Sequence, residues 1–211
     1  MVVRWVWALL GVAITVTACW AWVDRPVALW VHAQRSFEAE HSVLEPLAHI
    51  PDPLIPAACV LFVVLGLSAL YRVQGARGRN VGALSSVSMI VTETIKDGCK
   101  WLFGRSWPDN WHGSKPAFIG NGDYQFHWFA GGGGRGAFPS GHMAAATALL
   151  EVLWVYYPRL RPLLACSAAL VGLALIFSNS HFVGDVIAGA FLGALVAAMA
   201  VALFDRAAIS G

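Results

Sequence analysis

Long apolar runs recur along this chain of 211 residues and constrain its fold more than any other feature. A helix of about 20 apolar residues crosses the hydrocarbon core of a bilayer, and it satisfies its backbone polar groups internally. Six such runs are present, at about residues 5–23, 54–71, 81–103, 142–157, 163–180 and 182–204. The sequence therefore predicts an all-α fold, a polytopic membrane bundle of six transmembrane helices that forms a single domain over residues 1–211.

The composition supports a membrane protein and argues against several other classes. Hydrophobic residues make up 58% of the chain and charged residues 12%, about half of the charged fraction of a soluble domain. The net charge of +2 is small and the chain has no basic tract, so nucleic acid is not an expected partner. The four cysteines have no metal-ligand spacing and are expected to be buried, inert thiols: Cys19, Cys59, Cys99 and Cys166.

The distribution of arginines predicts the orientation in the membrane. Six spans place both termini on one side, together with most arginines outside the loop: Arg4, Arg72, Arg77, Arg79, Arg159, Arg161 and Arg206. By the positive-inside rule, the termini are cytoplasmic in a multi-pass protein of the inner membrane. The long loop at 104–138 then faces the periplasm or cell exterior, and 24–50 is expected to form short amphipathic helices at the outer interface.

A glycine-rich stretch, GGGGRGAFPSGHMAAATALL, leads from this loop into the fourth predicted span. Ser140 is a natural N-cap, and the free N–H groups of the first turn favour an anion there. His142 stands two residues past this cap, and Arg135 lies five residues before it. The pattern indicates phosphate chemistry, and the alternative is a glycine-rich turn with a chance histidine.

His181 and Asp185 are four residues apart at the start of the last span, so they share one helical face. A carboxylate that holds one ring nitrogen leaves the other free as a nucleophile or base. The alternative is a structural pair that caps the helix. Further along the same span, Gly189 and Gly193 are expected to allow close helix packing.

The third span supplies the cations, with Lys100 near its outer end and Arg105 just beyond. Glu93 and Asp97 fall on the same helical face as Lys100, so these acids are predicted to be its counter-ions. Elsewhere, Glu151 is a buried acid to which the sequence assigns no role, and His127 in the loop is expected to have no chemical duty. No carboxylate cluster offers to hold a metal, so neither a metal nor another cofactor is expected.

These features resemble the phosphatidic acid phosphatase type 2 superfamily of membrane phosphatases, which shares its site with vanadium haloperoxidases. The family has three motifs: a lysine followed after six residues by Arg-Pro; Pro-Ser-Gly-His; and Ser-Arg, five residues, His, three residues, Asp. The second motif is complete at 139–142, Lys100 and Pro108 match the first, and His181 and Asp185 match the third. The resemblance places the active-site region at about 96–190.

Two departures affect the expected phosphate ligands. Trp107 replaces the arginine of the first motif, and Ala-Leu at 174–175 replaces the Ser-Arg of the third. In the family both arginines bind phosphate oxygens, and each such charge-assisted contact contributes about 1.5–3 kcal/mol. Arg105 and Arg135 are the available replacements, with Arg105 favoured because it lies nearer the motif lysine, and Asn179 is a further hydrogen-bond donor.

The resemblance implies a mechanism through a phosphohistidine. His181, oriented by Asp185, attacks the phosphorus in line, while Lys100, an arginine and the N–H groups of Ser140 and Gly141 hold the equatorial oxygens. Protonated His142 gives its proton to the leaving oxygen and then activates the water that releases phosphate.

Four tryptophans ring the predicted site and place it at headgroup depth: Trp101, Trp107, Trp111 and Trp128. The expected substrate is a lipid phosphate or pyrophosphate, such as phosphatidic acid, phosphatidylglycerol phosphate, an isoprenoid pyrophosphate or a lipid A phosphate. Three alternatives stay open at this point. They are a lipid phosphotransferase with the same site, a degenerate scaffold or transporter lacking the two arginines, and a haem-binding bundle that uses His142 and His181.

Overall fold

A computed structural model describes residues 2–35, 76–109, 116–131 and 134–210. Their helices are α1 Val2–Ala18, α2 Asp24–Arg35, α5 Ala76–Phe103, α6 Phe118–Asn121, α7 Gly141–Tyr156, α8 Arg161–Phe177 and α9 Val183–Ser210. A π-helical turn at Cys19–Val23 joins α1 to α2, and a 3-10 turn at Pro158–Leu160 precedes α8. Within the described residues the β-structure is limited to two isolated bridges. The predicted all-α class is confirmed.

Three helices of the described part are long and apolar enough to cross a membrane: Val3–Gln34, Pro158–Phe177 and Val183–Asp205. α5 and α7 occupy the positions of the third and fourth predicted spans. The predicted span at 54–71 lies outside the described residues. The chain is therefore a multi-pass membrane protein with a helical bundle.

The first helix is longer than the sequence predicts. Its apolar run was expected to end at residue 23 and to be followed by separate interfacial helices, but 24–35 continues it through the π-turn. The backbone N–H of Asp24 donates to the carbonyl of Cys19, so the chain stays helical across the charge. Asp24 does not end the helix because its carboxylate is buried against a partner from another segment. The rest of the segment, 36–50, lies outside the described residues.

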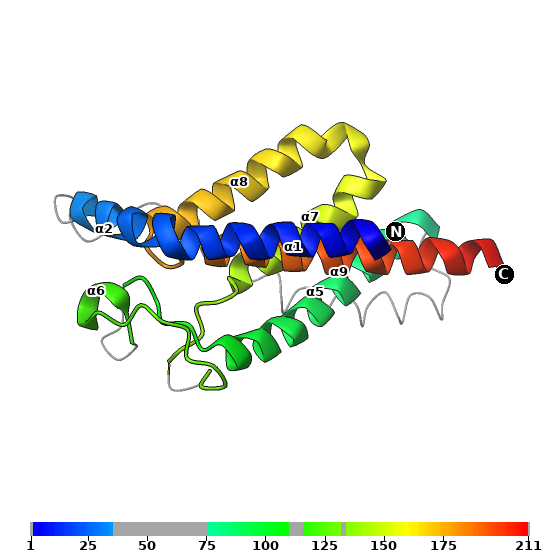
Figure 1. Ribbon diagram of the computed structural model, residues 1–211. Coiled ribbons are helices and arrows are strands. Elements are labelled where there is room, and N and C mark those ends of the chain that lie inside the picture. The colour runs from blue at the N-terminus through cyan, green and yellow to red at the C-terminus, as the bar shows by residue number, and fades with distance from the viewer. Residues whose placement is uncertain (1, 36–75, 110–115, 132–133, 211) are drawn as a thin grey trace.

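Small residues set the spacing of the helices around the site. A Cβ at Gly189 would lie 2.4 Å from the carbonyl oxygen of Ser140, and one at Gly193 would lie 2.2 Å from that of Ala144. The backbones of α7 and α9 thus touch directly, which confirms the predicted role of the two glycines. In Figure 1, α1 and α9 run side by side through the bundle, with α8 on one side and α5 on the other.

The cysteines only partly follow the expectation of burial. Cys19 is buried and Cys99 partly buried, whereas Cys166 is exposed on α8. Cys166 is exposed because α8 covers the bundle with one face only, and 28% of its spanning segment is buried. Cys59 lies outside the described residues.

The loop after α5 folds over the end of the bundle that is opposite to the two chain termini (Figure 1). Gly131 packs on the last turn of α5, where a Cβ would lie 1.9 Å from the carbonyl oxygen of Lys100. The loop then enters α7 at Ser140, whose N–H donates to the carbonyl oxygen of Asp185 at 3.0 Å. This bond ties the start of α7 to the start of α9, and it brings the second and third motifs together.

Candidate active site

The N-terminus of α7 is built as an anion-binding end. The Ser140 side chain caps the helix by accepting from the N–H of Met143 at 3.4 Å. The N–H of Ser140 itself is used by Asp185, so it is not one of the two phosphate donors expected from the sequence. Gly141 lies in the first turn, where helix geometry provides no intrahelical acceptor for its N–H.

Two lysines of α5 reach this end of α7. A Cβ at Gly141 would lie 2.9 Å from Cδ of Lys96 and 3.8 Å from Nζ of Lys100, so both lysine side chains lie against this residue. Lys96 forms ion pairs with Glu93 and, at 3.1 Å, with Asp97. Among the described residues, the ion pairs of these two acids therefore go to Lys96, not to Lys100 as expected. The reason is that Lys96 lies within one turn of both acids.

Lys100 lies beside the aromatic wall of the loop. Its Nζ is 5.8 Å from the ring centre of Trp107, and its Cδ would lie 3.6 Å from a Cβ at Gly136. The indole N–H of Trp107 donates to the carbonyl of Gly134 at 2.6 Å, which pins the glycine-rich loop over the lysine. The tryptophan that replaces the motif arginine thus forms a wall of the site.

His181 lies in the turn between α8 and α9 and is 3% exposed. The turn is held by bonds to the carbonyl of Leu175 from the N–H groups of Ser180 and His181, at 3.1 and 3.2 Å. The imidazole lies 5.2 Å from the ring centre of Trp107 and 6.3 Å from that of His142. Both motif histidines therefore face the same space at the start of α7.

Asp185 accompanies His181, as the spacing predicts, but at ion-pair distance. Nδ1 of His181 lies 3.7 Å from Oδ2 of Asp185, which is too long for a hydrogen bond. Burial lowers the pKa of His181, and the nearby Asp185 carboxylate and a hydrogen bond with the backbone of Ala137 only partly offset this effect. A lowered pKa favours the neutral ring, which is the state that a nucleophilic imidazole requires.

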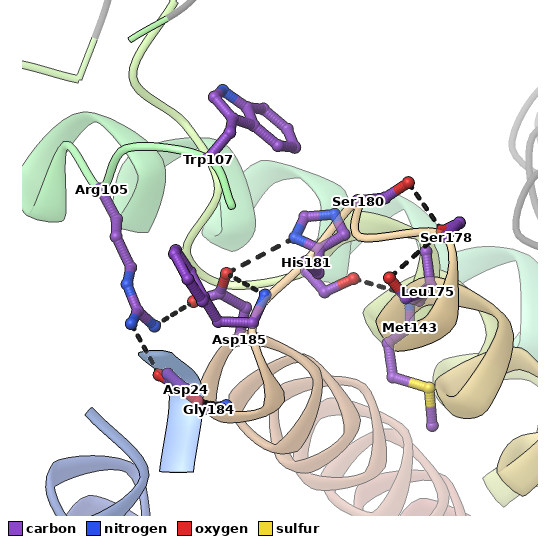
Figure 2. Close-up of polar contacts among 12 residues, drawn as sticks. Asp24, Arg105, Trp107, Met143, Leu175, Ser178, Ser180, His181, Gly184 and Asp185 are labelled. Atoms are coloured by element: carbon purple, nitrogen blue, oxygen red, sulfur yellow. Dashed lines mark hydrogen bonds and ion pairs between the residues drawn. The ribbon is translucent and has the colours of Figure 1, made fainter. Parts of the chain in front are cut away.

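Arg105, the favoured replacement for the missing arginines, is held by two carboxylates instead. Its Nη1 donates to Oδ1 of Asp185 at 2.5 Å, and its Nη2 donates to Oδ2 of Asp24 at 2.6 Å (Figure 2). The arginine is 1% exposed. Sequence reasoning missed Asp24, and the available signal was an acid that follows an apolar run without any obvious partner.

The other two candidate phosphate donors have protein partners as well. Arg135 is partly exposed, and its Nε and Nη2 both lie 3.4 Å from Oδ2 of Asp123, which also holds His127 at 2.8 Å. Asn179 has a φ of 56° and its side-chain amide donates to the carbonyl of Ala28 at 3.2 Å. Asn179 thus anchors α2 to the turn that carries His181.

An apolar groove of about 950 Å³ begins beside the Pro-Ser-Gly-His motif. Phe138 and Pro139 line it, and the remaining walls come from α1, the π-turn, α2, α5, α9 and the loop. Near the loop, Trp101 and Trp128 are more than half exposed. Trp111 lies outside the described residues. Among the described residues no group of three or more His, Cys, Asp or Glu is placed to hold a metal ion.

Comparisons with known proteins show the family of the chain. The family model of the PAP2 superfamily matches residues 82–208, which is more than half of the chain. The lipid A 1-phosphatases of Rhizobium johnstonii and Rhizobium etli are 26% and 25% identical to the chain over 126 residues, 60% of its length. The match spans only about half of these relatives, 49% and 51% of their lengths.

A solved structure shares the fold. The PAP2-type phosphatidylglycerolphosphate phosphatase of Bacillus subtilis matches with a TM-score of 0.52 and 15% identity, over 93% of this chain and 96% of that one. At this identity, the likeness concerns the fold alone.

Proposed function

Because the chain belongs to the PAP2 superfamily, we propose that it is an integral-membrane lipid phosphate phosphatase that works through a phosphohistidine. The observation that carries the proposal is the convergence of His142, His181 and Lys100 on the N-terminus of α7. Two imidazoles and a cation at an anion-binding helix end are the parts that phosphoryl transfer needs.

In the first step, Nε2 of His181 attacks the phosphorus because Nδ1 faces Asp185. The P–N bond forms as the bond from phosphorus to the lipid oxygen breaks, and His142 gives its proton to that oxygen. In the second step, His142 takes a proton from water, the resulting hydroxide attacks the phosphorus, and the P–N bond breaks. Phosphate leaves and both histidines return to their starting states.

Lys100 and the N–H groups of the first turn of α7, including that of Gly141, hold the equatorial oxygens, where negative charge concentrates in the transition state. Arg135 joins them by exchanging its long contacts with Asp123 for the phosphate. A metal ion is not required in this scheme, because lysine, helix end and protonated histidine supply the positive charge.

The substrate is a phosphate or pyrophosphate on a membrane lipid. The apolar groove beside Pro139 supports this class, because it offers room for an acyl or isoprenoid chain next to the site. The relatives named above act on lipid A and on phosphatidylglycerolphosphate, and phosphatidic acid and isoprenoid pyrophosphates share the same chemistry. We place the protein in the inner membrane, with the site facing the periplasm or exterior and the termini in the cytoplasm.

The test is phosphate release by the detergent-purified protein from a panel of these four lipid classes, with EDTA present. His181→Ala is expected to abolish release, while the control His32→Ala, an exposed histidine on α2, leaves it unchanged. Phosphate transferred to an added acceptor lipid instead of water would make the protein a phosphotransferase. A wild-type protein that neither releases nor transfers phosphate would refute the proposal and favour a scaffold.

A further inference from the structure

Arg105 lies at the centre of a buried ionic cluster that consists of Asp24, Arg105 and Asp185. The three residues come from the N-terminal helix, the loop after α5 and the start of α9. The guanidinium bridges the two carboxylates, which are themselves buried (Figure 2). Asp24 is 81 positions from Arg105 in the chain and lies outside the segment that the family model matches.

Each carboxylate oxygen of the cluster has its own donor. Oδ2 of Asp24 and Oδ1 of Asp185 accept from Arg105, while Oδ1 of Asp24 accepts from the N–H of Gly184 at 3.0 Å. Oδ2 of Asp185 accepts from the N–H of Phe182 at 3.1 Å. The two carboxylates exceed the single guanidinium by one negative charge, and the N-terminus of α9 stabilises that charge.

Arg105 has no face left for a substrate. Three aromatic rings surround its guanidinium, with ring centres 5.6 Å away for Tyr124, 4.8 Å for Phe126 and 4.3 Å for Phe182. Two carboxylates occupy its terminal nitrogens, and the residue is almost fully buried. A phosphate can bind this arginine only if the whole cluster comes apart.

We propose that Arg105 and Asp24 are positioning residues that hold the Asp185 carboxylate so that its Oδ2 faces His181. Arg105 fixes Oδ1 of Asp185 and thereby the plane of the carboxylate. Asp24 fixes the second nitrogen of Arg105 and the first turn of α9. This inference rests on the proposed function, and it makes the N-terminal helix part of the catalytic apparatus.

The experiment measures kcat, KM and the inhibition constant of inorganic phosphate for Asp24→Asn and Arg105→Lys on whichever lipid phosphate the wild type hydrolyses. A displaced Asp185 misorients the nucleophile, so kcat per folded molecule is expected to fall about 10–100-fold. KM and the phosphate inhibition constant are expected to stay within about twofold, because the phosphate ligands are untouched. Lys100→Ala serves as the contrast, since it raises the phosphate inhibition constant.

Tyr124→Phe is the matched structural control. The Tyr124 hydroxyl donates to the carbonyl of Trp20 at 2.6 Å, so it also ties the N-terminal helix to the loop. Phenylalanine removes this tie but keeps the ring over Arg105. This variant is expected to melt earlier than the wild type with an unchanged kcat. If the cluster had a purely structural role, Asp24→Asn and Arg105→Lys would give the same result.

Gly184→Ala extends the test if Asp24→Asn does not fold. Its Cβ would lie 3.2 Å from Oδ2 of Asp24 and 3.5 Å from Nη1 of Arg105, so it pushes on the cluster without removing a charge. A smaller drop in kcat is expected. If the wild type is active and Asp24→Asn keeps its kcat, this inference is overturned but the proposed function stands. The same follows if Arg105→Lys raises the phosphate inhibition constant as much as Lys100→Ala does. An inactive wild type would instead refute the proposed function.

Discussion

Gly189 lets α9 pack directly against the start of α7, because glycine has no Cβ at this contact. An alanine Cβ there would lie 2.4 Å from the carbonyl oxygen of Ser140, 3.2 Å from its carbonyl carbon and 3.3 Å from Cβ of Met143. Real Cβ contacts are essentially never shorter than 3.0 Å, and the contacted atom is backbone, so a helix has to move. Such overpacking costs about 1–3 kcal/mol.

The movement also reaches the reacting groups. Asp185 lies one turn before Gly189, and its carbonyl accepts from the N–H of Ser140 at 3.0 Å. A shift of α9 away from α7 stretches this bond and separates His181 from His142. Since a misplacement of about 1 Å costs on the order of 100-fold in rate, Gly189→Ala is expected to lower kcat about 10–100-fold.

Gly11→Ala in α1 is the matched control, because a Cβ at Gly11 meets nothing within 4 Å. There the same substitution should stabilise the helix by about 0.5–1 kcal/mol, since glycine is the poorer helix former. Thermal melting in detergent and phosphate release are measured for both variants. Wild-type melting and activity in Gly189→Ala would refute the close packing of α7 on α9.

Three further predictions concern His181, Lys100 and the apolar groove. Burial lowers the pKa of His181, so the unfolded chain binds a proton below about pH 6.5 that the folded protein does not. Stability is therefore lost as the pH falls below that value, and pH-dependent melting should show a smaller loss in His181→Gln. Lys100→Ala removes a charge-assisted contact of about 1.5–3 kcal/mol, so the inhibition constant of inorganic phosphate should rise about 10–100-fold. An unchanged inhibition constant would exclude this lysine as a phosphate ligand. Val16→Trp places a large ring in the apolar groove, so KM should rise for a long-chain lipid phosphate but not for a soluble aryl phosphate; equal effects on both would show that the groove holds no chain.

The helices and the local motifs could be predicted because their causes lie within a few residues. Apolar runs predict spanning helices because a backbone polar group without a hydrogen bond is costly in lipid. The first helix nevertheless continues past its expected end. Ser140 caps α7 as expected because capping involves only the next three residues. The close spacing in the chain also brings His181 within 3.7 Å of Asp185, although His181 lies in the turn before α9 and not on the face of that helix as expected.

The partners of the charged residues were decided by tertiary structure. From the sequence, Arg105 lies near Lys100 and was expected to bind phosphate, yet the fold turns it toward Asp24 and Asp185. Electrostatic energy depends on distance through space and on burial, and no pattern along the chain states either quantity. The sequence by itself determined which helices form and which chemical groups are available. Only the packing of the N-terminal helix, the loop and α9 decided which carboxylates Arg105 holds, because these segments meet only in the folded chain.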